Sequence, residues 1–123
     1  MVMSAHLTHA GLAGDDADPA TLSRSVIQRL LRDELAYSGV VVTDDLDMGA
    51  ILDHYPLDET ILKAIEAGND ILLFSGTKRD TQPLPGIVRK IVCRAIVDGR
   101  LSRERIAESY DRILRLKRAR LGS

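Results

Sequence analysis

Three carboxylates within four positions are the strongest chemical feature of the sequence. Asp44, Asp45 and Asp47 directly follow the apolar run 40–42, in the segment Thr-Asp-Asp-Leu-Asp-Met over 43–48. Like charges at this spacing repel one another, and no turn geometry requires all three of them. We therefore expect at least one of these carboxylates to take part in chemistry.

The local pattern of this acidic cluster allows three interpretations. The acids could be structural, because Asp favours turns and helix N-caps. The spacing of Asp45 and Asp47 after a strand also resembles the Mg²⁺-dependent nucleophile loop of the haloacid dehalogenase phosphatases. In a glycosidase, an ionised Asp would attack the anomeric carbon and form a covalent glycosyl-enzyme. The pattern alone leaves all three open.

Three apolar runs are typical of strands that are buried in a parallel sheet. They cover residues 2–5, 40–42 and 71–74, and polar residues follow each of them. The carboxyl ends of parallel strands and the loops after them build the sites of α/β folds. We therefore expect His6, the acidic cluster and Ser75 to lie along one edge of the sheet.

Apolar residues at helical spacing predict four helices between and after these strands. Three are expected over 23–39, 56–67 and 87–96, each with glycine at or just beyond its end. Ser102 is expected to cap a fourth, basic helix. The single cysteine, Cys93, is expected in a buried position on the third helix, since free cysteine is among the most buried residue types.

The order strand, helix, strand, helix, strand, helix, helix predicts an α/β fold with a parallel sheet and right-handed crossovers. A long polar loop, rich in glycine and aspartate, is expected over 8–19. A complete (β/α)8 barrel takes about 250 residues. Three βα units and a final helix would therefore be under half of a barrel, and spacing alone does not separate this from an open doubly wound sheet.

The segment 30–47 resembles the signature of glycoside hydrolase family 3. It reads Leu-Leu-Arg-Asp-Glu over 30–34 and Gly-Val-Val-Val-Thr-Asp over 39–44, with a further Asp at 47. Weaker likenesses extend over 2–6, 20–23, 67–70 and 113–117. The resemblance implies that residues 1–123 are the C-terminal part of a TIM-type barrel, a partial N-terminal-type domain of this family that lacks the first strands. It also implies that Asp44, which follows Thr43, is the nucleophile.

Residues 44–50, Asp-Asp-Leu-Asp-Met-Gly-Ala, are more similar to the bacterial β-N-acetylglucosaminidases of this family than to its β-glucosidases, which carry Trp after the nucleophile. This implies a retaining hydrolase that releases terminal β-N-acetylglucosamine, from peptidoglycan fragments, through a glycosyl-Asp44 intermediate and without cofactor or metal. Met48 is expected near the bound sugar. His6 is expected to contact the sugar or, more in keeping with its setting, to support the site through hydrogen bonds.

Two parts of the family pattern lie outside these 123 residues: a Lys-His-Phe-Pro-Gly-like segment and the His-Asp pair that the resemblance implies as acid and base. We therefore expect the isolated chain to lack useful hydrolase activity. Its open sheet edges are expected to recruit a missing N-terminal barrel half or to self-associate. A non-catalytic truncated gene product is an alternative, as is a Mg²⁺-dependent phosphatase or phosphotransferase that uses Asp45 and Asp47.

Net charge and the length of the apolar runs bear on two classes of partner, nucleic acids and membranes. The net charge is −1 and the basic residues gather on the last expected helix, so nucleic acid is not an expected partner. No apolar run approaches the roughly 20 residues that span a bilayer, and no leader pattern follows Met1. A membrane is not expected as a partner, and the cytoplasm is the expected location.

Overall fold

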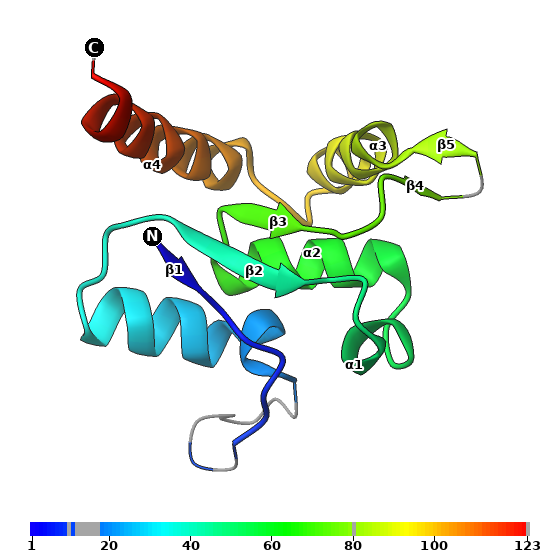
Figure 1. The fold of residues 1–123 in the computed structure, drawn as a ribbon, viewed down its shortest axis with the longest axis horizontal. Helices are drawn as coiled ribbons and strands as arrows, with labels where there is room; N and C mark the ends of the chain where they lie inside the picture. Colours follow the sequence, from blue (N-terminus) through cyan, green and yellow to red (C-terminus); the bar gives the residue numbers. More distant parts are fainter. Residues whose placement is uncertain (10, 12–17, 80, 123) are drawn as a thin grey trace.

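The three predicted strands form one parallel sheet in the computed structural model, which describes residues 1–9, 11, 18–79 and 81–122. The strands are β1 (Val2–Met3), β2 (Val41–Asp45) and β3 (Ile71–Leu73), in the order β1-β2-β3. The parallel α/β prediction is confirmed (Figure 1). Most of the loop expected over 8–19 lies outside the described residues.

Strand β2 is the buried strand of the sheet, as its run of β-branched residues predicts. The prediction that residues 2–5 form a buried strand is wrong: β1 has two residues, and Val2 and Met3 are both exposed. Among the described strands, β1 pairs with β2 alone, so no described strand pairs with its other edge. Strand β3 is likewise an edge strand, with Leu73 exposed.

All four predicted helices are present. They are η2 (Ser25–Glu34), α2 (Leu57–Ala67), α3 (Leu84–Val97) and α4 (Arg103–Leu121). The sequence did not predict the 3-10 turn η1 (Ala20–Leu22), the short helix α1 (Gly49–Leu52) or the hairpin formed by β4 (Lys78–Arg79) and β5 (Gln82–Pro83). Helix η2 lies on the β1 side of the sheet, and α3 and α4 lie on the β3 side (Figure 1).

Helix η2 is a π-helix, which is wider than an α-helix because its hydrogen bonds span five residues. At its C-terminal end the Leu35 N–H donates to the Leu30 carbonyl. Its two buried residues, Ile27 and Arg32, are also five positions apart and so lie on the same side of the helix. This spacing brings a buried guanidinium onto the inner face of the helix.

Helix α2 lies at the centre of the core, because it contributes to all three clusters of buried apolar residues. Ile61, Leu62 and Ile65 pack with residues of α3 and of the turn before α4. Ala64 packs with η1 and with Leu46, which follows β2, and Ala67 packs with Ile27 and Val41. The helix ends at Gly68, whose φ of 117° is a conformation that L side chains rarely adopt.

Two predictions about α3 and α4 have opposite outcomes. Ser102 caps α4 as predicted, because its hydroxyl accepts the Arg105 N–H at 3.0 Å. Cys93 is exposed, so the prediction of a buried cysteine is wrong. The apolar stripe of α3 that packs on the core contains Val92 and Ala95, and Cys93 points away from it. Within the described residues, no helix is long and apolar enough to cross a membrane.

Candidate active site

A β-bulge lies in β2 where the strand reaches the acidic cluster. Val42 pairs with Ile71, and Asp45 pairs with Leu73. Two residues of β2 therefore lie between these pairs, opposite one residue of β3. The extra residue lies between these two pairs, in the part of β2 that contains Thr43 and Asp44. Bulges of this kind re-aim a side chain and are frequent beside active sites.

Thr43 and Leu46 hold the bulge against β3. The Thr43 hydroxyl accepts the Leu73 N–H at 2.9 Å, in a position where a strand would ordinarily offer a backbone carbonyl. The Leu46 N–H donates to the Leu73 carbonyl, also at 2.9 Å. Both backbone groups of Leu73 are therefore bonded to residues that flank Asp44 and Asp45.

Two of the three clustered carboxylates hold the loop that follows β3. Asp45 Oδ1 accepts the Asp47 N–H at 3.0 Å and the Ser75 N–H at 2.9 Å. Asp47 Oδ2 accepts the Gly76 N–H at 2.7 Å, and Asp47 Oδ1 is paired with Arg79. These bonds satisfy the two carboxylates with N–H donors, which is a structural role.

Asp44 differs from both of its acidic neighbours. Its carboxylate, which is partly exposed, accepts the Asp45 N–H at 2.8 Å, and within the described residues it has no hydrogen bond to another strand or helix. The sequence predicted that at least one acid of the cluster takes part in chemistry. The Asp44 carboxylate has the fewest hydrogen bonds of the three, and its chemical role stays a prediction.

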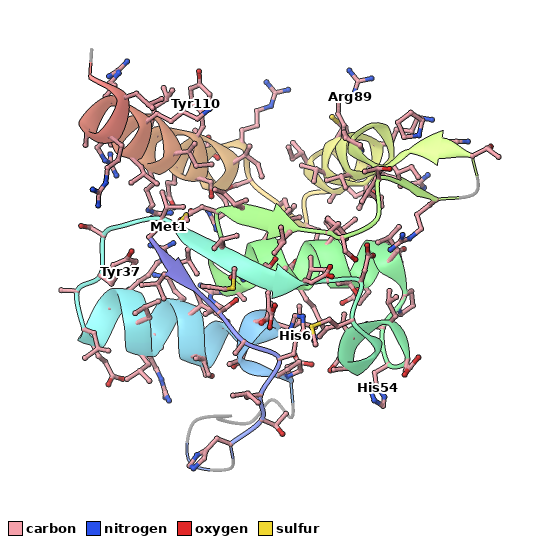
Figure 2. The ribbon with its side chains drawn as sticks, viewed as in Figure 1. Met1, His6, Tyr37, His54, Arg89 and Tyr110 are labelled. Atoms are coloured by element: carbon pink, nitrogen blue, oxygen red, sulfur yellow. The ribbon has the colours of Figure 1, made fainter. Side chains whose placement is uncertain are left out.

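His6 follows β1 and lies beside the carboxyl end of β2 (Figure 2). Its Nε2 is 2.8 Å from the Asp45 carbonyl oxygen, and its Nδ1 is 3.0 Å from Thr21 Oγ1. A carbonyl only accepts, so Nε2 donates to it, whereas the Thr21 hydroxyl can either donate to Nδ1 or accept from it. Both ring nitrogens of His6 are therefore occupied by protein groups, as a residue that supports the site through hydrogen bonds would be.

The polar chain continues from Thr21 into the interior. The Ser4 hydroxyl lies 3.2 Å from Thr21 Oγ1 and 3.1 Å from Asn69 Oδ1, and the Asn69 amide donates to the carbonyls of Thr21 and Ala64 at 2.8 Å. Ser4, Thr21 and Asn69 are all buried. Because buried polar groups without partners are destabilising, this chain fixes η1 and the end of α2 relative to His6.

The remaining predicted residues lie at or near the same edge of the sheet. Met48 is exposed, forms the N-cap of α1 and donates its N–H to the Asp45 carbonyl. Ser75 is exposed and is tied to Asp45 through its backbone. His54 is exposed, and His9 accepts the Gly11 N–H. Contact of His6 or Met48 with a sugar stays a prediction.

Sequence reasoning assigned Thr43 no role and considered Thr21 only as a possible N-cap for the helix expected over 23–39. Each hydroxyl acts across a distance in sequence, from Thr43 to Leu73 and from Thr21 to His6. The only signal for Thr43 was its place before Asp44 in the family signature. Nothing local in the sequence distinguished Thr21, because its partner is reached only after folding.

Among the described residues, no group of three or more His, Cys, Asp or Glu side chains is arranged to hold a metal ion. Asp45 and Asp47, which a Mg²⁺ site would need, already accept backbone N–H groups and a guanidinium. The geometry of these two carboxylates therefore offers no support for the phosphatase interpretation.

Comparison with known proteins gives consistent matches. Residues 1–116 match the model of the glycosyl hydrolase family 3 N terminal domain. The chain is 33% identical over 129 residues to β-hexosaminidase A of Pseudoalteromonas piscicida, covering 95% of this chain and 21% of that protein. It is 33% identical over 122 residues to β-hexosaminidase LpqI of Mycobacterium tuberculosis, covering 94% of this chain and 29% of LpqI.

A solved family 3 β-N-acetylglucosaminidase from Paenibacillus sp. superposes with a TM-score of 0.78 at 42% identity, over 89% of this chain and 20% of that one. The chain thus spans between a fifth and a third of the length of these relatives.

Proposed function

Because the chain belongs to glycosyl hydrolase family 3, we propose that it forms part of a retaining β-N-acetylhexosaminidase in which Asp44 is the nucleophile. The observation that carries this proposal is the contrast within the acidic cluster. Asp45 and Asp47 are engaged by N–H donors, whereas the Asp44 carboxylate lies on a bulge at the carboxyl end of β2 with one local hydrogen bond. An available, ionised carboxylate is what covalent glycoside cleavage requires.

The mechanism that follows has two displacements. Asp44 attacks the anomeric carbon of a terminal β-N-acetylglucosaminide while an acid protonates the leaving oxygen, and water then hydrolyses the glycosyl ester. We assign the acid to no residue of this chain. His6 is a poor candidate because both of its ring nitrogens are bonded to protein groups. We propose that the acid comes from the part of the enzyme beyond the matched segment.

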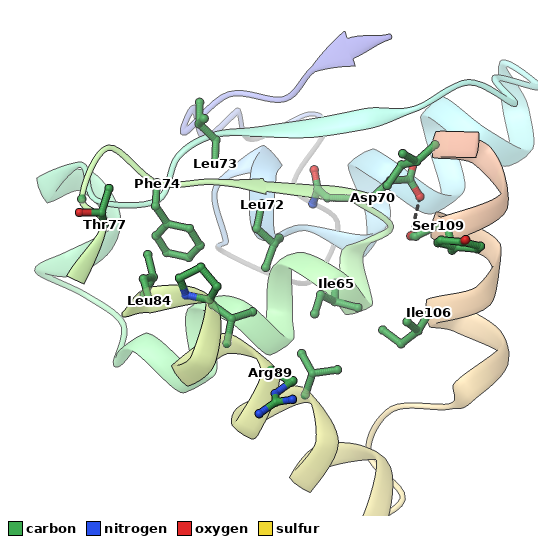
Figure 3. Close-up of a pocket in the computed structure, with 17 residues that line it drawn as sticks. Ile65, Asp70, Leu72, Leu73, Phe74, Thr77, Leu84, Arg89, Ile106 and Ser109 are labelled. Atoms are coloured by element: carbon green, nitrogen blue, oxygen red, sulfur yellow. Dashed lines mark hydrogen bonds between the residues drawn. The ribbon is translucent and has the colours of Figure 1, made fainter. Parts of the chain in front are cut away.

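We further propose that residues 1–123 act within a longer (β/α)8 barrel, contributing about three βα units and a final helix. Among the described residues, β1 and β3 are each paired on one edge only, which supports this proposal. So does a groove of about 720 Å³ beside β3, between α3 and α4, whose lining is mostly apolar (Figure 3). The groove includes Leu72, Phe74, Leu84, Val88 and Ile106. Burying such a surface against further barrel elements would be favourable, and self-association is the alternative.

The natural substrate and the location are also parts of the proposal. The likeness of residues 44–50 to bacterial β-N-acetylglucosaminidases supports N-acetylglucosamine as the released sugar. On the same resemblance we propose peptidoglycan fragments as its source and the cytoplasm as the site of action. A comparison of chitobiose with muropeptide fragments as substrates tests the first of these two points, and cell fractionation tests the second.

A chimera tests the function. Residues 1–123 replace the matched segment of M. tuberculosis LpqI, and release of the aryl alcohol from an aryl β-N-acetylglucosaminide is followed. We expect hydrolysis by the chimera and a loss of at least about 10³-fold in kcat for Asp44→Asn, in keeping with removal of a covalent nucleophile. Asp111→Asn, an exposed carboxylate on α4, is the matched control and should leave kcat unchanged.

The isolated chain is assayed beside the chimera and is expected to show no useful hydrolysis. A folded chimera that is inactive, or one in which Asp44→Asn and Asp111→Asn behave alike, contradicts the proposed nucleophile. Mg²⁺-dependent cleavage of a phosphate ester by the chain, without cleavage of the glycoside, would instead support the phosphatase interpretation.

A further inference from the structure

We infer that Thr43 and His6 are positioning residues that set the direction of the Asp44 carboxylate, Thr43 by closing the bulge in β2 and His6 by holding the Asp45 carbonyl. The inference rests on the proposed function, because it concerns how the nucleophile is aimed. Neither residue is assigned contact with the sugar. Each acts through the backbone on one side of Asp44.

The Thr43 hydroxyl replaces a backbone acceptor. A strand that carries one extra residue cannot keep every backbone hydrogen bond to its neighbour. At this bulge the Leu73 N–H instead donates to Thr43 Oγ1 at 2.9 Å. Thr43 is 0% exposed and its hydrogen bond to Leu73 is part-buried, so loss of the hydroxyl removes the protein acceptor of the Leu73 N–H. Loss of this bond would weaken the register that the bulge imposes, which would turn Asp44 away from its present direction.

His6 acts on the opposite side of the nucleophile. Its Nε2–H donates to the Asp45 carbonyl at 2.8 Å, and its ring is held by the Thr21 hydroxyl on Nδ1. Thr21 is itself 0% exposed and lies within hydrogen-bond distance of Ser4. The ring cannot rotate without breaking bonds at both nitrogens, so it fixes the peptide between Asp45 and Leu46.

The two contacts bracket Asp44 and Asp45. Leu46, the next residue along, is bonded to the same Leu73 through its N–H. The backbone around Asp44 is thus tied down while its carboxylate remains available, a combination that preorganises a nucleophile without occupying it.

Paired variants of Thr43 in the hydrolysing chimera test the inference. Thr43→Val keeps the shape and removes the hydroxyl, whereas Thr43→Ser keeps the hydroxyl. We expect Thr43→Val to lower kcat by about 10²-fold, as for a nucleophile displaced by about 1 Å, with KM changed less than about threefold. Thr43→Ser should recover kcat to within about threefold of the parent. A Val variant as active as the Ser variant would overturn the role of Thr43.

A second pair separates positioning by His6 from sugar binding. His6→Gln can still donate to the Asp45 carbonyl, whereas His6→Asn is too short to reach it. We expect Gln to retain at least about tenfold more kcat than Asn, with KM nearly constant in both. A raised KM with unchanged kcat in both variants would mean that His6 binds the sugar, which overturns its positioning role.

Nuclear magnetic resonance of the 123-residue chain gives a readout that does not depend on turnover. Nε2 of His6 should carry a proton that is hydrogen-bonded to the Asp45 carbonyl, and hydrogen exchange at the Leu73 amide should be faster in Thr43→Val than in Thr43→Ser. An Nε2 without a proton, or equal exchange in the two variants, contradicts the inference. Failure of the parent chimera to hydrolyse any glycoside contradicts the proposed function instead, and these resonances then decide the positioning geometry alone.

Discussion

Asp70 Oδ2 lies 2.8 Å from Arg32 Nη2, and the two side chains are 0% and 5% exposed. The pair joins η2 to the entry of β3, at the opposite end of the sheet from Asp44. Arg32 also donates to the Gly68 and Gly39 carbonyls. Asp70 accepts the Val41 N–H at 3.0 Å and is further bonded, through its second oxygen, to Ser109 and Arg112 of α4.

Removal of the guanidinium should therefore unfold the chain readily. We expect Arg32→Leu to lower the free energy of unfolding by about 3 kcal/mol, the low end for a broken buried pair, because Arg112 still reaches the second oxygen of Asp70. Arg32→Lys should not restore stability, since an ammonium cannot form the same fork of bonds. Urea unfolding followed by circular dichroism measures both.

Arg29→Leu is the matched control for this prediction. Arg29 lies on the same helix but is 66% exposed, and its contact with Glu34 is 3.9 Å long. An exposed pair of this kind contributes less than about 1 kcal/mol. Equal losses of stability in Arg29→Leu and Arg32→Leu would contradict a structural role for the buried pair.

The same carboxylate makes stability depend on pH. Burial by itself raises the pKa of Asp70, but hydrogen bonds from Val41 and Ser109 and the charge of Arg32 outweigh it and hold that pKa below its ordinary value. A lowered folded-state pKa contributes stability that is present above the unfolded-state pKa. That contribution is lost as pH falls through the folded-state pKa.

We accordingly expect the urea midpoint of the chain to fall on acidification below about pH 4–5. Asp70→Asn should be less stable at neutral pH and should show a shallower decline, because it lacks the titrating group. Asp111→Asn, whose carboxylate is exposed, should follow the parent. Parallel pH profiles for Asp70→Asn and the parent would show that Asp70 is not the source of the slope.

How much of this molecule the sequence predicts depends on the range of the interactions involved. Local signals placed β2 by its β-branched run, the end of α2 by Gly68 and the start of α4 by Ser102, and all three are confirmed. The burial of Cys93 was predicted wrongly, because apolar neighbours along a helix do not say which of its faces meets the core.

In the candidate site, too, local signals were predictable from the sequence and contacts between distant residues were not. The family signature singled out Asp44 as the expected nucleophile, which stays a prediction, and strand ends placed His6 beside the acidic cluster. The different hydrogen bonding of the three carboxylates was not accessible from the sequence, because the partners of Asp45 and Asp47 are N–H groups of Ser75 and Gly76 on the next strand's loop. The bulge was also not predictable, since a register shift is a property of two strands together.

Tyr55 offers a test of how the long loop is held. Burial, and then the hydrogen bond of 2.7 Å to Asp18, raise the pKa of Tyr55 to about 12. Asp18 also pairs with Lys63 at 2.6 Å, so it ties the end of the loop to α2. A raised pKa means that this contribution to stability is present below about pH 10 and is lost as pH rises toward 12.

We expect alkaline titration of tyrosinate absorbance to show one tyrosine that ionises earlier in Asp18→Asn than in the parent chain. The variant removes the anionic acceptor but keeps a side chain of similar size. Asp58→Asn, on an exposed residue of α2, serves as the control and should leave the titration curve unchanged. Superimposable curves for Asp18→Asn and the parent would contradict the contact between Asp18 and Tyr55.

The claim that Asp44 is a covalent nucleophile is tested most directly by trapping the intermediate. The hydrolysing chimera is incubated with an activated 5-fluoro N-acetylglucosaminide, which slows breakdown of the glycosyl ester, and the labelled peptide is then mapped by mass spectrometry. We expect one sugar ester, on Asp44, and no label in Asp44→Asn. An ester on Asp45, Asp47 or any other residue, or turnover with no ester under conditions that trap M. tuberculosis LpqI, would contradict the account.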